Sequence, residues 1–148
     1  MYDEQHHAMD LFGELLKNYH IILNKELNKY GLYKGQPFIL RFLKEHPSIT
    51  QKELAQKMHV TKSTIGASIR RMEKIGFLKR SQDPEDSRCN RIVITQKGIK
   101  ALEDCEKDIE KIMEALYSKI PEEEGDLVID VLKKLLEGLN SFREQEKL

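Results

Sequence analysis

The feature that most constrains the fold is a pair of short helical segments that follow each other almost without a gap between Ile49 and Ile75. Thr50 is a good N-cap, and Glu53 three residues later completes a capping box at the start of the first segment. The dipeptide His59-Val60 breaks that segment, and Thr61 caps the next one. Apolar residues on one face of the second segment are Ile65, Ile69 and Met72. Two capped helices joined by a tight turn are typical of a helix-turn-helix.

Helical periodicity accounts for most of the remaining chain. Apolar residues recur at intervals of three and four in further segments: residues 9–30, 37–43, 96–119 and 127–142. Only Phe77–Ser81 and Arg91–Thr95 resemble strands, and a turn around Asp83-Pro84 separates them. A two-stranded ribbon is marginal in water, so it should pack on the preceding helices. We therefore expect a mainly α (α+β) fold: a winged helix-turn-helix with a two-stranded β-wing, flanked by helical regions.

The composition excludes several other classes of protein. With 148 residues, 39% of them hydrophobic, the chain has the size of about one domain. No apolar run approaches the ~18–20 residues of a membrane helix, and the start has no signal-peptide pattern. Cys89 and Cys105 have neither disulfide-framework nor zinc spacing, and no P-loop, G-x-S-x-G or dinucleotide fingerprint occurs. We expect a cytoplasmic protein that is not an enzyme and has no cofactor or metal.

The charges are sorted along the chain, although the net charge is zero. Residues 1–59 hold eight basic and seven acidic residues, residues 60–100 hold ten and four, and residues 101–148 hold seven and fourteen. A basic middle between neutral and acidic ends indicates one surface that meets a polyanion. On its own this sorting is a weak pointer to nucleic acid, since basic solvated faces are common; together with the helix-turn-helix it favours double-stranded DNA as a partner.

The second helix of the helix-turn-helix would carry most of the DNA contacts, because in this motif it enters the major groove. Its small residues permit close approach to bases, and its cations reach bases or phosphates. Gly66 costs roughly 1 kcal/mol of helix propensity relative to Ala, so a close approach of another group could explain it. The candidate DNA-binding residues are Thr50, Lys62, Ser63, Thr64, Ala67, Arg70 and Arg71.

The predicted wing supplies a second candidate contact. Arg88 and Arg91 stand beside its tip, and an Arg on a mobile tip suits a narrow minor groove. Acidic residues nearby would oppose phosphate binding unless they pair with arginines. We therefore interpret Asp86 as the residue that orients Arg88.

The segments TQKELAQKMHVTKSTIGASIRRMEKIGFLKR and DPEDSRCNRIVITQKG resemble the MarR family of bacterial transcriptional regulators. The Asp86–Arg88 segment resembles the family's D-x-R wing signature, and ITQKG resembles its entry into the next helix. The resemblance implies a homodimeric regulator, usually a repressor released by a small molecule or stress signal, on a pseudo-palindromic operator. It also implies dimerisation through residues 1–31 and 101–148 around a DNA-binding domain at 32–100. An apolar stripe from Leu127 to Phe142, larger than the winged part could cover, independently favours an interface.

The same resemblance implies a ligand site between the dimerisation and DNA-binding regions. The residues Tyr19, Tyr30, Tyr33 and Phe38 are interpreted first as ordinary core, and the binding of a small aromatic ligand near them is a hypothesis. Many relatives carry Arg where this chain has Ala67, which shifts the expected specificity toward Ser63, Thr64 and Arg70. The first helix has no cysteine for peroxide sensing of the kind some relatives use.

Alternatives to this interpretation stay open from the sequence. Cys89 could be a redox switch or an incidental thiol exposed on the wing, and Cys105 is expected in the core. The histidines do not have the spacing of a helical metal site; they are His6, His7, His20, His46 and His59, the first two in a frayed start. The chain could instead be a helical interaction module that does not use DNA, or an architectural DNA protein without operator choice.

Overall fold

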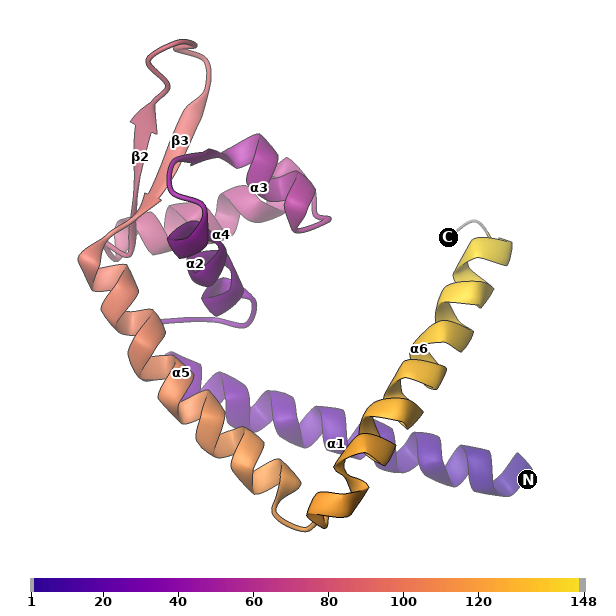
Figure 1. The fold of residues 1–148 in the computed structure, drawn as a ribbon. Helices are drawn as coiled ribbons and strands as arrows, with labels where there is room; N and C mark the ends of the chain where they lie inside the picture. Colours follow the sequence, from indigo (N-terminus) through magenta and orange to yellow (C-terminus); the bar gives the residue numbers. More distant parts are fainter. Residues whose placement is uncertain (1, 147–148) are drawn as a thin grey trace. The chain divides into compact units, whose positions relative to one another are not determined.

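The computed structural model describes residues 2–146 and is mainly α-helical, as expected (Figure 1). The helices are α1 (Tyr2–Asn28), α2 (Gln36–Glu45), α3 (Gln51–Lys57), α4 (Lys62–Lys74), α5 (Gln96–Tyr117), the 3-10 helix η1 (Glu122–Glu124) and α6 (Gly125–Glu146). The strands are β1 (Ile49–Thr50), β2 (Leu78–Gln82) and β3 (Asn90–Ile94). No helix in this part of the chain is long and apolar enough to cross a membrane.

The sheet has three antiparallel strands in the order β1-β3-β2, so the expectation of only two strands was wrong. β2 and β3 form the predicted wing, with Leu78 opposite Ile94 and Gln82 opposite Asn90. The additional strand β1 pairs Ile49 with Ile92 of the wing. β1 has only two residues before the cap of α3, which is too few to show the alternation that marks a strand. This strand joins the helix-turn-helix to the base of the wing.

Capping residues define the start of the central helices as the sequence predicts. Both halves of the capping box are present at α3: the Glu53 backbone N–H donates to Thr50 Oγ1 at 3.2 Å, and the Thr50 N–H donates to Glu53 Oε2 at 2.8 Å. These contacts hold the pKa of Glu53 below its ordinary value, chiefly through the Thr50 backbone N–H. Thr61 caps α4 by accepting from the Thr64 N–H at 3.1 Å. His59, between the two helices, has φ +52°, which closes the tight turn.

The first helix is longer than expected. α1 begins at Tyr2, whereas the apolar periodicity begins at Met9. His6 and His7 therefore lie in a regular helix, and the prediction of a frayed start is wrong. Asp3 and Glu4 in the first turn favour this extension, because negative charge is stabilising near a helix N-terminus.

The hydrophobic core of the described chain lies within residues 27–105. We call this region the winged part; it comprises the end of α1, α2, the helix-turn-helix, the wing and the start of α5. The apolar residues of the core all lie between Leu27 and Cys105: Leu27, Leu32, Ile39, Leu40, Leu43, Leu54, Ala55, Ile65, Ile69, Met72, Phe77, Leu78, Ile92, Ala101, Leu102 and Cys105. The prediction that Cys105 belongs to the core is confirmed, and burial raises the pKa of its thiol to about 11. The position of α4 is thus fixed by those of its residues that pack into the core.

A tight joint connects the end of α4 to the start of α5. The Thr95 hydroxyl donates to the Gly76 carbonyl, and Lys97 Nζ donates to the Ile75 carbonyl at 2.6 Å. Gly98 packs against the backbone here: a Cβ atom at this position would lie 2.1 Å from the carbonyl oxygen of Phe77. Only glycine fits such a contact. The ITQKG segment therefore fixes α5 to the helix-turn-helix.

The described chain divides into two compact units, residues up to Ile112 and residues from Met113 onward. The first unit contains α1, the helix-turn-helix, the wing and most of α5. In the second unit α6 has no buried residue. Its exposed large apolar residues are Leu127, Ile129, Val131, Leu132, Leu135, Leu136, Leu139 and Phe142.

Candidate nucleic-acid interface

The outer face of α4 is polar and exposed because its inner face is anchored in the core. Ile65, Ile69 and Met72 are at most 2% exposed, and this fixes which side of the helix faces outward. The outward residues are Lys62, Ser63, Thr64, Ala67, Arg70 and Arg71, all of them exposed. The arrangement presents hydroxyl, methyl and cationic groups on one continuous helix, as base reading requires.

Arg70 and Arg71 have different surroundings, although they are adjacent on α4. The Arg71 guanidinium lies over the ring of Tyr33, 4.2 Å from the ring centroid. Among residues 2–146, the Arg70 guanidinium makes no hydrogen bond, ion pair or ring contact. Arg70 therefore presents an uncompensated charge, while part of Arg71 is occupied by an aromatic face.

Two of the candidate hydroxyls are engaged within the protein. Thr50 Oγ1 donates to Glu53 Oε2 at 2.7 Å in addition to accepting the cap hydrogen bond. Thr61 and Thr64 share a hydrogen bond of 2.9 Å between their hydroxyl groups. The geometry gives Thr50 a part in positioning α3, whereas Ser63 remains outward and exposed.

The wing tip holds Arg88 beside Asp86. Arg88 Nε donates to Asp86 Oδ1 at 3.1 Å, and the Arg88 backbone N–H donates to the same oxygen at 3.0 Å. The Arg88 side chain is 89% exposed. These contacts hold the pKa of Asp86 below its ordinary value. The pairing expected from the sequence is present, and it leaves the guanidinium facing outward.

Arg91 lies on β3 opposite Ser81, near the loop end of the ladder, and its side chain is bonded within the protein. Its Nε donates to Asp83 Oδ2 at 3.0 Å, and its Nη1 donates to the Ser48 carbonyl at 2.7 Å. Asp83 is 8% exposed, and the pKa of its carboxyl is lowered, first by the Glu85 backbone N–H and then by Arg91. Ser48 has φ +67°. Arg91 thus ties the wing to the turn before β1.

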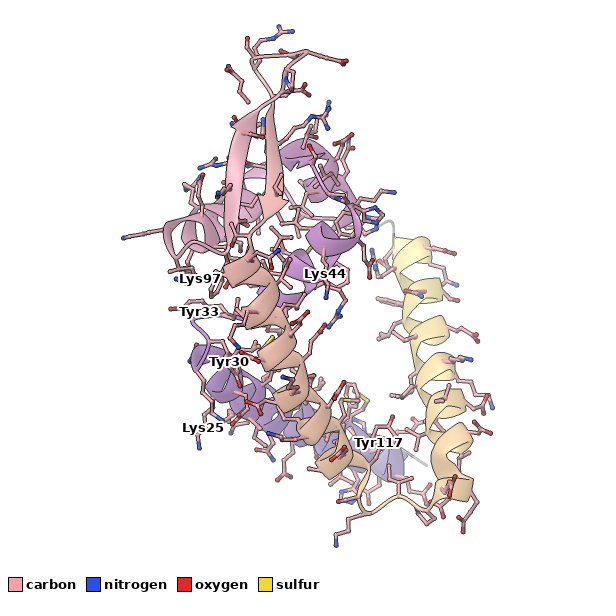
Figure 2. The ribbon with its side chains drawn as sticks, turned by 60° about the vertical axis from the view of Figure 1, so that its left-hand side comes forward. Lys25, Tyr30, Tyr33, Lys44, Lys97 and Tyr117 are labelled. Atoms are coloured by element: carbon pink, nitrogen blue, oxygen red, sulfur yellow. The ribbon has the colours of Figure 1, made fainter. Side chains whose placement is uncertain are left out.

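The four aromatic residues of the predicted ligand site do not share one environment. Tyr30 donates its hydroxyl to Asp108 of α5 at 2.5 Å, and Tyr33 lies under Arg71. Tyr30 and Tyr33 are labelled in Figure 2. Phe38 is 52% exposed, and the ring of Tyr19 lies 5.9 Å from that of His20.

One cavity touches this group. It measures about 410 Å³ and is lined by Tyr30 but by none of the other three aromatic residues. Its remaining lining comes from the ends of α1, α4 and α5, including Lys97 (Figure 2). The sequence prediction of a common aromatic site therefore remains a proposal.

Cys89 is half-buried on the wing, whereas the sequence predicted an exposed thiol. Its Sγ lies 3.6 Å from Asp86 Oδ2, so the same carboxylate that holds Arg88 also covers the sulfur. Within residues 2–146 no three His, Cys, Asp or Glu side chains come together in a way that could hold a metal ion.

Sequence reasoning missed Gln51. It is the first residue of α3, and its Nε2 donates to the Lys62 carbonyl on α4 at 3.3 Å. A glutamine after a helix cap carries no periodicity or charge signal, so only the crossing of the two helices reveals this position.

The chain is similar to known proteins in both sequence and fold. Residues 32–90 match the MarR family. The HTH-type transcriptional regulator YdgJ of Bacillus subtilis is 25% identical over 112 residues, which are 76% of this chain and 68% of YdgJ. The crystal structure of MarR is 29% identical and covers 93% of both chains with a TM-score of 0.72. A variant of S. aureus MepR bound to an oligodeoxyribonucleotide is 25% identical, covers 89% of this chain and 97% of its own, and has a TM-score of 0.62. The match to the MarR family spans the helix-turn-helix and β2, the relatives are HTH-type transcriptional regulators, and the solved structures share the fold over most of the chain, so this chain is similar in sequence and fold to MarR-family transcriptional regulators.

Proposed function

We propose that the protein acts as a homodimer that binds a pseudo-palindromic DNA operator and represses transcription until a small molecule or stress signal releases it. The observation that carries this proposal is the exposed outer face of α4, held by an inner face that is completely buried. The similar MepR variant is bound to an oligodeoxyribonucleotide, which supports DNA as the partner. In this proposal the protein works in the cytoplasm, as a binding protein and not as an enzyme.

The proposed contacts follow the exposure of each residue. Lys62, Ser63, Thr64, Ala67 and Arg70 face the major groove, and Arg71 reaches a phosphate from its place over Tyr33. Arg88, oriented by Asp86, enters the minor groove. Thr50 holds α3 in place and Arg91 holds the wing in place through their internal hydrogen bonds. Any contact of these two residues with DNA is to the phosphate backbone.

The proposed dimer uses the apolar faces that the chain leaves exposed. Besides those of α6, exposed apolar residues on α1 include Leu15, Leu16 and Ile22, and Met113 and Leu116 are exposed at the end of α5. Exposed apolar helix faces of this kind mark interfaces in soluble proteins. A second copy of this chain is the proposed occupant, because two-fold symmetry matches a palindromic operator, with half-sites about 10 bp apart.

Release by a small aromatic ligand is the remaining part of the proposal. Tyr19, Tyr30, Tyr33 and Phe38 lie on α1, on the connection that follows it and on α2. A ligand that contacts Tyr33 would act on Arg71 of α4 directly, because the two side chains are stacked. Such a ligand would change the position of one recognition helix relative to the other in the dimer.

The experiment that tests the proposed function is a salt titration of the wild-type protein with a labelled random-sequence duplex. Binding through Lys and Arg releases counterions, so affinity should fall steeply as salt rises. A helical interaction module without DNA binding would give no salt-sensitive complex. An architectural DNA protein would also form a salt-sensitive complex in this titration. In a competition experiment, however, bulk DNA would displace such a protein from promoter DNA as readily as from any other sequence.

A further inference from the structure

The glycine in the middle of α4 lies beneath two long side chains. Gly66 is buried, although it belongs to the turn that carries the outward residues. A Cβ atom at this position would lie 3.0 Å from Gln51 Nε2 and 3.3 Å from Arg70 Nη1. The two nitrogen atoms therefore converge on one point of the helix surface. One comes from α3 and the other from α4.

Gln51 is held in this place by a hydrogen bond to α4. Its Nε2 donates to the Lys62 carbonyl, which fixes which end of the amide faces Gly66. One amide hydrogen and the Oε1 atom have no other partner among residues 2–146. The amide is thus oriented and still able to donate outward.

Arg70 supplies the charge at this point. Four other arginines pair with carboxylates: Arg41, Arg80, Arg88 and Arg91. Arg70 has no such partner in the described chain and points its guanidinium across Gly66. The Gln51 amide N–H and the Arg70 guanidinium are adjacent donors, and Gln51 Oε1 is the acceptor on the same amide. The complement of the two donors is a pair of acceptors, such as O6 and N7 of guanine.

We propose that Gln51 and Arg70 act as one donor pair that reads a guanine edge in the major groove, and that residue 66 is glycine because both side chains lie on it. This inference rests on the proposed DNA binding and adds the reading residues and the base. It assigns a specificity role to Gln51. It also gives Gly66 a reason other than close approach of the helix backbone to DNA.

The test begins with an operator selected by the wild-type protein from a random duplex pool, followed by binding to duplexes in which each base pair is changed singly. For wild type, replacing the guanine that the pair reads should weaken binding about ten-fold. In the double variant Gln51→Ala, Arg70→Ala that discrimination should disappear, while the other positions keep theirs. If the double variant instead loses affinity equally for every sequence, the pair contacts phosphate and the proposal is overturned.

A coupled substitution tests the role of Gly66. The Ala methyl group of Gly66→Ala would displace only the flexible ends of Gln51 and Arg70, so the fold should persist and the melting temperature should not fall. Operator affinity should fall about ten-fold in the wild-type background and stay unchanged in the Gln51→Ala, Arg70→Ala background. An equal loss in both backgrounds would show that the glycine serves direct backbone approach, which contradicts the proposal. Absence of any wild-type complex would contradict the proposed function itself, a result distinguishable from these.

Discussion

The winged part of the chain and α6 use leucine and isoleucine in opposite ways. Between Leu27 and Cys105 most leucine and isoleucine side chains are buried or half-buried against one another, and the polar face of α4 is left outward. On α6 the apolar side chains are exposed; Leu139, for example, is 64% exposed. The first region contains the buried core, whereas the apolar face of α6 is uncovered in the described chain. In the proposed function, this contrast separates DNA recognition from dimerisation.

The largest effect should come from charging the apolar face of α6. Leu135→Asp with Leu139→Asp places four carboxylates in the proposed dimer interface. Full burial of one leucine is worth about 1.5–3 kcal/mol, so the dissociation constant of the dimer should rise at least a thousand-fold. Sedimentation at several concentrations measures this, and circular dichroism should show that the winged part stays folded.

The matched control for that pair places aspartates at Lys133 and Glu137, with the same spacing on the more polar side of α6. This control should keep the dimer. A dimer that survives Leu135→Asp with Leu139→Asp would mean that α6 is not covered by a second copy.

Gly98→Ala should produce the next largest effect, this time inside the winged part. The added methyl group meets the Phe77 carbonyl, a backbone atom that cannot turn aside, so unfolding should become easier by about 3 kcal/mol. Gly13 of α1 has nothing within 4 Å of its Cβ position, and Gly13→Ala should stabilise by about 0.5–1 kcal/mol. Urea denaturation compares the two, and equal effects of the two substitutions would rule out the close contact at Gly98.

The two wing arginines should separate binding from stability. Arg88→Ala removes an exposed side chain, so operator affinity should fall about ten-fold with no change in melting temperature. Arg91→Ala leaves Asp83 without its cation and frees the Ser48 carbonyl, so the melting temperature should fall. Thermal melts and binding isotherms of both variants check this. A stability loss in Arg88→Ala would overturn the division of roles.

A smaller effect should appear in the pH dependence of stability. The pKa of Asp108 is lowered to about 2, chiefly by the Lys111 ammonium and then by the Tyr30 hydroxyl, and the same bond raises the pKa of Tyr30 to about 12. Asp108 therefore stabilises the fold above its unfolded pKa of about 4. That contribution is lost as the pH falls toward 2. The contribution of Tyr30 is lost as the pH rises from 10 toward 12.

Tyr30→Phe provides the check on this pH dependence. The variant should show a smaller change in melting temperature in both windows. It should differ least from wild type at the acid extreme, where the bond to ionised Asp108 is already lost. Identical pH profiles for wild type and variant would mean that the bond between Tyr30 and Asp108 has no energetic weight.

Much of the fold could be predicted from the sequence because its signals are local. Thr50 and Thr61 mark their helices by side-chain caps that involve only the next three residues. The pairing of Asp86 with Arg88 is similarly local. By contrast, β1 is too short to show a pattern, and it exists only because Ile92 lies beside it. Long-range contacts of this kind leave no periodicity in the sequence.

The candidate site shows the same division. The outward residues of α4 follow from the positions of Ile65 and Ile69, so they could be named from the helical period. The internal bonds of Arg91 depend on the Ser48 carbonyl, 43 residues earlier in the chain. The position of Gln51 depends on how α3 crosses α4. Neither relation could be found without the arrangement of the elements in space.

The most direct test of the account is selection of bound sequences from a random duplex pool by the wild-type protein, followed by footprinting of the selected site. The account predicts a palindrome whose half-sites lie about 10 bp apart, each protected in the major groove by α4, with flanking minor-groove protection by Arg88. A single non-repeated site, or no enriched sequence at all, would contradict the claim that the winged part reads DNA while the exposed helices pair two copies.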